Sequence, residues 1–261
     1  MEIVPPARVL VTGASGYLAG FVAPRLRSAG YRLRGFDRVP PPPDRGYAEF
    51  VLGDITRFSD VREAVEGQDA VVHLVAIVRD KLEQPLERFV DVMVKGTWFL
   101  AEAAAQAGIK RLVNVSSIVA IGVPPARDAP LRESHPPLLG GTGLYYQLSK
   151  WLAEEIGRAY AQDRGLSVIN VRPGVIEGDG ANPGPSLPRE PLRLWFMYVA
   201  PDDVAQALEG ALRVSRPSQS AYFVVADHPE SAYDISAAKR DLGYAPRRNW
   251  KQLRCYTEEP E

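Results

Sequence analysis

The chain has 261 residues, enough for one large α/β domain or for a core domain with a small cap. Its formal net charge of -1, with 46% hydrophobic and 24% charged residues, is ordinary for a globular protein and gives no reason to expect nucleic acid as a partner. The single cysteine, Cys255, excludes an internal disulfide and a cysteine-rich metal site, and the three histidines (His73, His135 and His228) lack the spacing of metal ligands.

Strand-like and helix-like segments alternate through the first two thirds of the chain. Apolar runs predict strands at residues 8–12, 32–36, 49–52, 70–75, 111–116 and 166–171. Helical patterns lie between them, at residues 17–29, 59–66 and 85–107, and from the segment that contains Lys150 to about residue 164. Gly108 ends the third helix, and the prolines at residues 40–43 predict an extended, exposed loop.

This order predicts an α/β fold, a parallel sheet covered by helices on both faces. The strands are nearly continuous in Val, Leu and Ile, as burial on both sides requires. After Pro173 the pattern weakens into a Pro- and Gly-rich loop at 182–191, a helix at 201–214, a strand at 222–225 and a short helix at 236–242. We expect a core domain over residues 1–178 and a small cap, interleaved with the core, over residues 179–261.

A glycine-rich turn, Thr12-Gly13-Ala14-Ser15-Gly16-Tyr17-Leu18-Ala19-Gly20, follows the first predicted strand and opens the first helix. A pyrophosphate needs free backbone N–H groups and close approach, so a turn that binds one must lack bulky Cβ groups. Gly13 and Gly16 meet that need, and Ala19 or Gly20 lets the helix pack closely on the strand. The alternative is a tight turn without a ligand, but the strand–turn–helix context favours an NAD(P)-binding core domain.

Asp37 ends the second predicted strand, where a dinucleotide-binding fold places its ribose ligand. Its carboxylate would accept hydrogen bonds from the adenosine ribose and repel a 2′-phosphate, which favours NAD over NADP, although Arg38 would partly offset that repulsion. The alternative for Asp37 is a cap at the start of the loop. Asp54, after the third strand, would either bind the adenine amino group or form an Asx turn, and both interpretations stay open.

Tyr146 and Lys150 are four residues apart at the start of a predicted helix, so they lie on one helix face. A free tyrosine, with a pKa of about 10, is poorly ionised at neutral pH, and a nearby cation favours the tyrosinate. Ser117, at the end of the fifth strand, could donate to a substrate oxygen and hold it near that base. These three residues are the predicted catalytic set. The alternative is that Tyr146 only packs and Lys150 is solvated.

These motifs together resemble the extended branch of the short-chain dehydrogenase/reductase superfamily, the NAD-dependent epimerase/dehydratase group. The matching pieces are Thr12-Gly13-Ala14-Ser15-Gly16-Tyr17-Leu18, Gly53-Asp54-Ile55, His73-Leu74-Val75-Ala76, Gly96-Thr97, Val115-Ser116-Ser117, Tyr146-Gln147-Leu148-Ser149-Lys150, Arg172-Pro173-Gly174, Asp202-Asp203-Val204-Ala205 and Leu242-Gly243-Tyr244-Ala245-Pro246. The resemblance implies a Rossmann fold with Tyr146 as base, Lys150 on the nicotinamide ribose and Ser117 as hydroxyl anchor. It places the expected cofactor contacts at Gly13, Ser15, Gly16, Tyr17, Leu18, Asp37, Arg38, Asp54, Ile55, Leu74, Val75, Ala76, Tyr146, Lys150 and Pro173.

Three features depart from the pattern of the group. Met93 stands where the group usually has an asparagine that is associated with a proton relay, three residues before Gly96. Glu177 stands in place of a common tyrosine. The stretch between residues 180 and 202 is far shorter than the nucleotide-clamping insert of sugar-nucleotide epimerases.

That short stretch makes the chain look most similar to the compact uronate dehydrogenases. The matching tail residues are Arg193, Tyr198, Asp202-Asp203, Tyr233-Asp234 and Leu242-Gly243-Tyr244-Ala245-Pro246. We expect Ser117, Ile118 and Arg193 to contact the substrate, with Arg193 gripping a carboxylate; the alternative for Arg193 is a solvated loop arginine. Val78, Ile118 and Val119 replace the polar residues expected around sugar hydroxyls, so a more apolar pocket is predicted.

Three functions compete at this stage. The first is an NAD-dependent dehydrogenase or reductase of a small hydroxyl or carbonyl compound, the second a sugar-nucleotide epimerase or dehydratase, and the third a non-catalytic NAD(P)-sensing protein. We expect a small-molecule substrate, no bound metal, no membrane or nucleic-acid partner, and a cytoplasmic protein, because the first residues lack the pattern of a signal peptide. The helices around Trp98-Phe99 and Leu148, Trp151 and Leu152 carry large apolar residues, and the resemblance implies that they form a homodimer interface; the alternative is that these residues only pack on the sheet.

Overall fold

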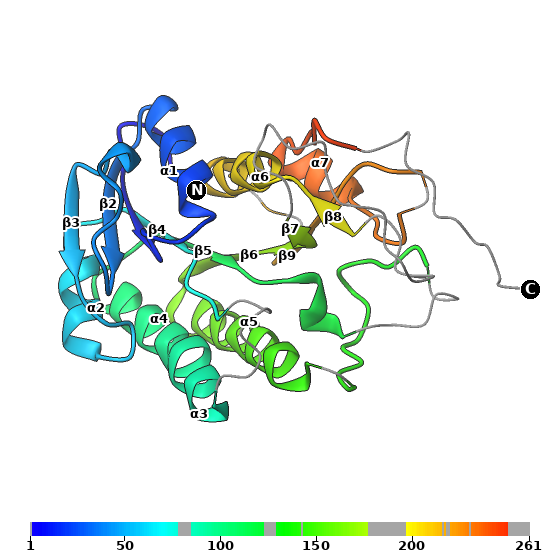
Figure 1. Cartoon of the computed structure of the whole chain (residues 1–261), viewed down its shortest axis with the longest axis horizontal. Coiled ribbons are helices and arrows are strands. Elements are labelled where there is room, and N and C mark those ends of the chain that lie inside the picture. Colours follow the sequence, from blue (N-terminus) through cyan, green and yellow to red (C-terminus); the bar gives the residue numbers. More distant parts are fainter. Residues whose placement is uncertain are drawn as a thin grey trace, which may run out of the picture.

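A seven-stranded parallel sheet forms the centre of the computed structural model, with helices on both faces (Figure 1). The structure describes residues 2–77, 85–122, 129–141, 143–176, 197–215, 217, 220–229 and 231–249. The strand order is β3-β2-β1-β4-β5-β6-β9, which is that of a doubly wound Rossmann sheet and confirms the predicted fold class. The strands are β1 Arg8–Thr12, β2 Arg32–Asp37, β3 Glu49–Leu52, β4 Ala70–His73, β5 Arg111–Val115, β6 Ser167–Pro173 and β9 Ala221–Val224.

Helices α1, α6 and α7 lie on one face of the sheet, and α2, α4 and α5 lie on the other (Figure 1). Their bounds are α1 Ala19–Ser28, α2 Phe58–Val65, α4 Gly96–Gln106, α5 Leu144–Arg164, α6 Pro201–Arg213 and α7 Ser236–Leu242. The longest, α5, follows Gly143 and precedes Gly165, both with positive φ, which lets the chain turn sharply at each end.

Two hydrophobic cores result from the alternation of side chains along the strands. Val9 and Val11 of β1 point to the core under α1 and α6, whereas Leu10 between them points to the core under α2 and α4. This double burial explains why the strand residues are apolar almost without interruption. Most predicted element ends are correct to within two residues, and the bounds of β3 and α7 are correct in full.

The helix predicted over residues 85–107 is interrupted. A single α turn, α3 (Leu86–Arg88), leads into a π-helix, Phe89–Lys95, and only then does α4 begin. The side chain of Thr97 donates a hydrogen bond to the carbonyl of Met93 at 2.7 Å, four residues earlier, which competes with the regular backbone pattern. Short π-helical segments are frequent at functional sites.

The C-terminal part of the chain contributes to the same sheet. Strand β9 pairs in parallel with β6, and α6 packs against α1. The buried guanidinium of Arg111 on β5 donates to the carbonyl oxygens of Ala211 and Leu212 at 3.0 Å and of Val214 at 2.6 Å, which satisfies the last turn of α6. Residues from the tail therefore belong to the Rossmann layers, and the division at residue 178 into a core and a substrate cap stays a prediction.

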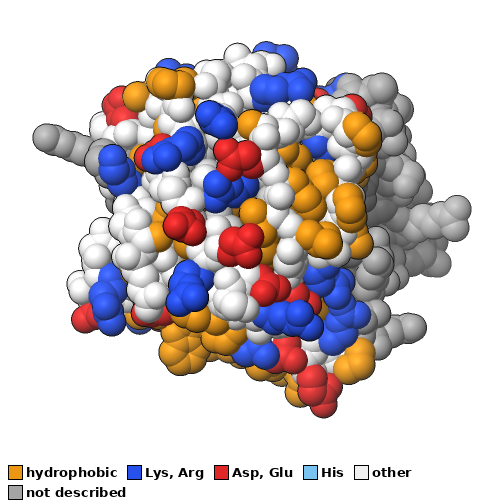
Figure 2. Space-filling view, turned by 90° about the vertical axis from the view of Figure 1, so that its left-hand side faces the viewer, with side chains coloured by type: hydrophobic (Ala, Val, Ile, Leu, Met, Phe, Trp, Pro, Cys, Tyr) orange, Lys and Arg blue, Asp and Glu red, His pale blue; other side chains and the backbone are white. Residues whose placement is uncertain are grey.

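Charged side chains cover the exposed edge of the sheet at β3. Glu49 of β3 forms ion pairs with Arg32 and Arg34 of β2, at 3.1 and 2.5 Å. Basic and acidic side chains are interspersed over this side of the molecule (Figure 2). Charges on an edge strand discourage pairing with another chain. None of the helices in the described ranges is both long and apolar enough to cross a bilayer.

Candidate active site

The predicted site residues follow the carboxyl ends of neighbouring strands. Gly13 follows β1, Leu74 follows β4, Ser117 lies just beyond β5, and Pro173 ends β6. The strand order reverses at β1, which has β2 on one side and β4 on the other. In open α/β sheets ligands bind outside the strand ends at such a switch point. The sheet thus brings the cofactor motifs and the catalytic motifs together at the carboxyl ends of its strands.

The glycine-rich turn has room for a ligand only because it lacks side chains. Gly13 has a φ of +72°, and a Cβ there would lie 3.1 Å from the backbone of Leu74 and Val75. The turn is closed by a hydrogen bond of 3.0 Å from Gly16 N–H to the Gly13 carbonyl. Among the described residues no side chain caps the start of α1, where the N–H groups of Gly20 and Phe21 donate to the carbonyls of Tyr17 and Leu18 at 3.0 Å. An anion at this end would be stabilised by the positive end of the helix dipole. This geometry fits a dinucleotide pyrophosphate.

Asp37 ties the end of β2 to the glycine-rich turn. Its carboxylate accepts hydrogen bonds from the backbone N–H of Ser15 at 3.0 Å, of Arg38 at 2.6 Å and of Val39 at 3.4 Å. The Ser15 hydroxyl donates to the Val39 carbonyl at 2.6 Å. The predicted loop cap is therefore present, and it holds the carboxylate beside the turn where an adenosine ribose would lie. Arg38, the residue after Asp37, is exposed.

The other residues predicted around the adenosine take different places. Asp54 forms the Asx turn, with Oδ1 accepting from the N–H and the hydroxyl of Thr56, both at 2.9 Å. Ile55 is buried in the core, where its side chain packs against Gly96 at the start of α4. Tyr47, which the sequence did not single out, donates its hydroxyl to the Ala14 carbonyl at 3.1 Å. Burial raises the pKa of this phenol, so it stays a donor to the turn.

Tyr146 and Lys150 lie on one face of α5. Tyr146 is half-buried, whereas Lys150 is buried, with Nζ 5.8 Å from the centre of the Tyr146 ring. Lys150 Nζ donates to the carbonyl of Val115, at the end of β5, at 2.7 Å. Burial lowers the pKa of Lys150 to about 8, and the carboxylate of Glu154 opposes that shift. The predicted alternative of a solvated lysine is therefore wrong.

Ser117 lies in extended backbone just after β5 and begins a 3₁₀ turn, Ile118–Ile121. Its hydroxyl oxygen accepts a long hydrogen bond of 3.4 Å from the N–H of Val119, and the turn packs against α5. Ile118 is buried, and Val119 is half-buried against the core. The hydroxyl thus stays available to donate to a ligand on the α5 side of the strand end.

Met93, at the position of the usual asparagine, lines the site with apolar surface. It is buried with Ile77 and Phe89, and Tyr146 packs against this small cluster. The tyrosine therefore packs against hydrocarbon on the side of the π-helix.

A buried polar ladder connects the glycine-rich turn with the π-helix. His73 Nδ1 lies 2.7 Å from the hydroxyl of Thr12, and Nε2 lies 3.2 Å from that of Thr97. Because the Thr97 hydroxyl donates to Met93, its oxygen accepts from His73 Nε2–H, and Nδ1 then accepts from Thr12. Burial, aided by the nearby charge of Lys150, lowers the pKa of His73 to about 3, so the ring is neutral.

Sequence reasoning missed this ladder, and it also missed an ion pair between Glu154 and Arg172. Two signals could have found the ion pair. Glu154 lies four residues after Lys150 on the same helix face, and Arg172 is a charge that directly follows the predicted strand at residues 166–171, which has none. A charge buried in a central strand requires a partner.

The remaining predicted residues are placed only in part. Leu74, Val75 and Ala76 follow β4, and the backbone of Leu74 and Val75 lies against Gly13. Tyr17 and Leu18 end the glycine-rich turn just before α1 begins. Pro173 is buried at the end of β6. Arg193, Val78 and Glu177 lie outside the described residues.

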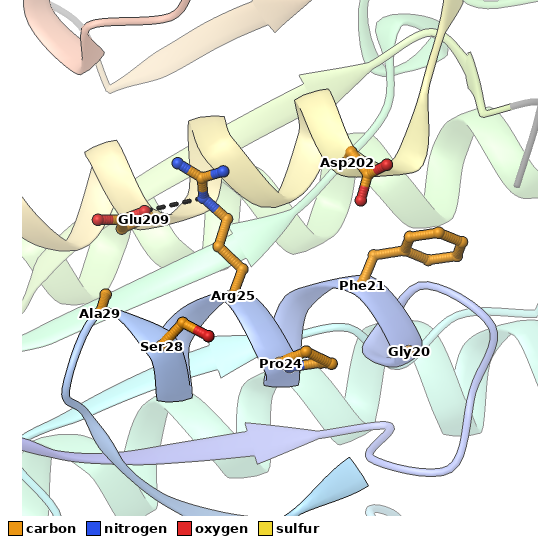
Figure 3. Close-up of a pocket in the computed structure, with 8 residues that line it drawn as sticks. All are labelled: Gly20, Phe21, Pro24, Arg25, Ser28, Ala29, Asp202 and Glu209. Carbon is orange, nitrogen blue, oxygen red and sulfur yellow. Dashed lines mark hydrogen bonds and ion pairs between the residues drawn. The ribbon is translucent and has the colours of Figure 1, made fainter. Parts of the chain in front are cut away.

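A surface groove of about 520 Å³ lies between α1 and α6, next to the cofactor motif (Figure 3). Gly20, Phe21 and Asp202 are among the residues that line it, and Arg25 donates to Glu209 across it at 2.8 Å. None of the predicted catalytic residues lines this groove. It is therefore separate from the catalytic motifs at the ends of β5 and β6.

Several known proteins that are similar to this chain are dehydrogenases or reductases. The family model of the NAD dependent epimerase/dehydratase family matches residues 9–212. The chain is 31% identical to cinnamoyl-CoA reductase 1 of Petunia hybrida over 193 residues, 68% of this chain and 57% of the reductase. It is 27% identical to the uronate dehydrogenase of Pseudomonas putida over 259 residues, 99% of this chain and 90% of that protein. It thus spans little more than half of the reductase but most of the dehydrogenase.

A solved structure extends this likeness to three dimensions. A mutant uronate dehydrogenase from Agrobacterium tumefaciens, complexed with NAD, has a TM-score of 0.73 with this chain at 28% identity. The likeness covers 92% of this chain and 84% of that one. The fold is therefore shared over nearly all of the chain, including the tail.

Proposed function

Because the chain belongs to the NAD-dependent epimerase/dehydratase family, we propose that it is an NAD-dependent dehydrogenase of a small hydroxyl compound, acting on a sugar or uronate. The observation that carries this proposal is the buried Lys150, with its Nζ 5.8 Å from the ring of Tyr146 at the strand ends. A buried ammonium beside a phenol serves no packing purpose and favours the tyrosinate.

In the proposed reaction each residue has one task. Tyr146 removes the proton of the substrate hydroxyl, Lys150 favours the ionised form of that tyrosine, and Ser117 donates a hydrogen bond to the substrate oxygen. With a pKa of about 8, Lys150 is mostly charged at neutral pH, as this task requires. The bound nicotinamide supplies the site that accepts the hydride.

The cofactor contacts are proposed from the geometry of the turn. Gly13 and Gly16 leave space for the pyrophosphate, and Asp37, held beside the turn, would accept from the adenosine ribose. A 2′-phosphate would meet the Asp37 carboxylate, so we propose NAD rather than NADP. The exposed Arg38 weakens this preference without reversing it.

The substrate is proposed from the relatives and the pocket wall. The uronate dehydrogenases match the chain over nearly its full length, which supports a uronate or a similar sugar. Ile118 and Val119 make the wall beside Ser117 apolar, which favours a substrate with fewer hydroxyl groups. A substrate carboxylate would be bound by Arg193.

Two alternatives remain in view. A sugar-nucleotide epimerase or dehydratase is disfavoured by the short stretch between residues 180 and 202. A non-catalytic NAD(P)-sensing protein is favoured only by Met93, which leaves an apolar surface where the group usually has a polar relay.

The decisive test is a substrate panel of alcohols, aldoses, uronates and UDP-sugars, with the absorbance of reduced nicotinamide followed for both cofactors. We expect turnover with NAD and a uronate or aldose. Conversion of a UDP-sugar without net reduction of NAD would favour the epimerase, and binding of NAD with no turnover of any compound would favour the sensor.

We also propose a cytoplasmic homodimer. The apolar side chains of Trp98 on α4 and Tyr145 on α5 are 56% and 53% exposed, and these two helices lie side by side. A second copy of the chain would cover them. Light scattering at micromolar concentration should give the mass of a dimer, and Trp98→Glu should give a monomer; a wild-type monomer would rule out this assembly.

A single cysteine fits a reducing compartment.

A further inference from the structure

A buried network around one ion pair joins α5, the end of β5 and β6, the three elements that carry the residues of the proposed catalytic site and its neighbour Pro173. The carboxylate of Glu154 on α5 accepts hydrogen bonds from Arg172 Nε at 2.9 Å and Nη2 at 2.7 Å. The hydroxyl of Ser116 donates to the same carboxylate at 2.5 Å. The side chains of Arg172 and Glu154 are only 9% and 8% exposed. Such a pair is weak evidence for stability, because apolar side chains of similar volume often stabilise a fold equally well.

Each member of this network stands next to a residue of the proposed site. Ser116 precedes Ser117, Arg172 precedes Pro173, and Glu154 lies one helical turn after Lys150. The backbone N–H of Ser116 also donates to the carbonyl of Val171 at 2.8 Å, which continues the pairing of β5 with β6. A displacement of the network would therefore move the site residues with it.

Helix α5 is attached to the end of β5 at two successive turns. Lys150 Nζ bonds the carbonyl of Val115, and Glu154 bonds the hydroxyl of Ser116, the next residue. Two attachments one turn apart fix both the rotation of a helix and its height above a strand end. The ring of Tyr146, one turn before Lys150, is thereby held relative to Ser117.

The network also sets the charge around Lys150. Three groups surround the ammonium: the Tyr146 ring and Glu154 from α5, and the neutral His73 from β4. Arg172 of β6 is paired with the Glu154 carboxylate. Burial lowers the pKa of Lys150 to about 8, and Glu154 is the one carboxylate that opposes this shift.

We infer that Glu154 is a positioning residue: its carboxylate, oriented by Arg172 and Ser116, anchors α5 at the end of β5 one turn after Lys150, where it favours the charged ammonium beside Tyr146. This inference rests on the proposed function, in which the charged lysine favours the tyrosinate. Activity then requires an ionised Tyr146 and a protonated Lys150, so that loss of the lysine proton sets the alkaline limit of the reaction.

The test follows Lys150 directly, by NMR titration of the full chain labelled with ¹³C at the lysine side chains. The Lys150 resonance is assigned by its disappearance in Lys150→Met. In Glu154→Gln, which keeps the shape of the side chain, this resonance should titrate about one pH unit lower or more. The alkaline limb of the kcat/KM profile on the substrate found by the panel should move by the same amount.

Ser116→Ala is the matched control, because it removes one hydrogen bond from the network and leaves both charges. Its Lys150 resonance should titrate as in the wild type. Glu154→Gln leaves the buried charge of Arg172 without its paired carboxylate, although the bond to the Glu133 carbonyl at 3.3 Å remains, and this loss can prevent folding. The double variant Glu154→Gln/Arg172→Gln therefore removes both charges together. It should show a downward shift as well.

An unchanged Lys150 titration in a folded Glu154→Gln variant, or in the double variant, would overturn the inference. An equal shift in Ser116→Ala would overturn it too, because packing rather than charge would then be responsible. If the wild type turns over no substrate in the panel, the proposed function fails, whereas the NMR titration still decides whether Glu154 controls the charge of Lys150.

Discussion

At the ends of β1 and β2 the site is made of backbone, whereas at the ends of β5 and β6 it is made of side chains. The first half consists of a glycine-rich turn, the start of α1, and a carboxylate bonded to the N–H of Ser15. The second half consists of hydroxyl, ammonium, guanidinium and carboxylate groups, joined by the bonds of Lys150 to Val115 and of Glu154 to Arg172.

The difference follows from what each half has to contact. A pyrophosphate is an anion that backbone N–H groups bind well, so that half requires space rather than functional groups. Proton transfer requires a group that titrates, and only side chains supply one. The backbone half should therefore be damaged by adding atoms, and the side-chain half by removing them.

The largest effect is expected from Tyr146→Phe, which removes one oxygen from the side-chain half. Turnover should fall by about 10²–10⁴-fold, because the proton acceptor is lost, while NAD affinity should be kept. Steady-state kinetics and calorimetric titration with NAD measure the two quantities. Tyr145→Phe, at the exposed neighbour, is the control and should be near wild type. Near-normal turnover of Tyr146→Phe would mean that another group is the base.

A smaller effect is expected from Gly13→Ala, which adds one methyl group to the backbone half. The new Cβ would lie 3.1 Å from the backbone of Leu74 and Val75, so the turn must shift. We expect NAD affinity to fall by more than about tenfold, since a shift of about 1.4 kcal/mol suffices for that. Gly108→Ala is the control, because Gly108 also has a positive φ (+69°) but open space around it. Equal NAD affinity in Gly13→Ala and wild type would show that the turn does not bind the cofactor.

Asp37→Asn tests the one side chain on which the backbone half is expected to depend. Removal of the charge should narrow the preference for NAD over NADP by about tenfold, because the repulsion of a 2′-phosphate disappears. The amide oxygen can still accept from the N–H groups of Arg38 and Val39, whereas the amide nitrogen cannot accept the hydrogen bond from Ser15. Calorimetric titration with both cofactors measures the ratio. Asp44→Asn changes an exposed carboxylate on the following loop and should leave the ratio alone. Tighter binding of NADP than NAD by the wild type would contradict the role of Asp37.

The two halves also differ in how far the sequence could predict them. The strands, the glycine-rich turn and the spacing of Tyr146 and Lys150 could be predicted, because each depends on local pattern. The positions of Glu154 and Arg172 signal that each needs a partner, but the geometry of their pairing and the contacts of His73 could not be predicted, because they join residues from different elements once the sheet has formed. For the same reason, the π-helix could not be distinguished from the continuous helix predicted over residues 85–107.

His73 lies at the boundary between the two halves, bonded to Thr12 before the turn and to Thr97 behind the π-helix. Its pKa is about 3 in the folded chain, lowered by burial, and about 6.5 in an unfolded chain. Between these values the unfolded chain binds the extra proton, so the free energy of unfolding falls as the pH drops below 6.5.

The smallest predicted effect follows from this linkage. Compared with pH 8, the wild type at pH 6 should lose about 0.8 kcal/mol of unfolding free energy through His73, and about 1.4 kcal/mol more per further pH unit down to about pH 4. His73→Gln, compared by urea unfolding at the same pH values, should lack this loss, although it is less stable at pH 8 because the ladder is altered. His135→Gln, on the surface loop, controls for removal of a histidine as such. If the free energy of unfolding of His73→Gln fell with pH as steeply as that of the wild type, the His73 ring would not be held neutral in the folded chain. The contact between the two halves of the site would then not depend on protonation.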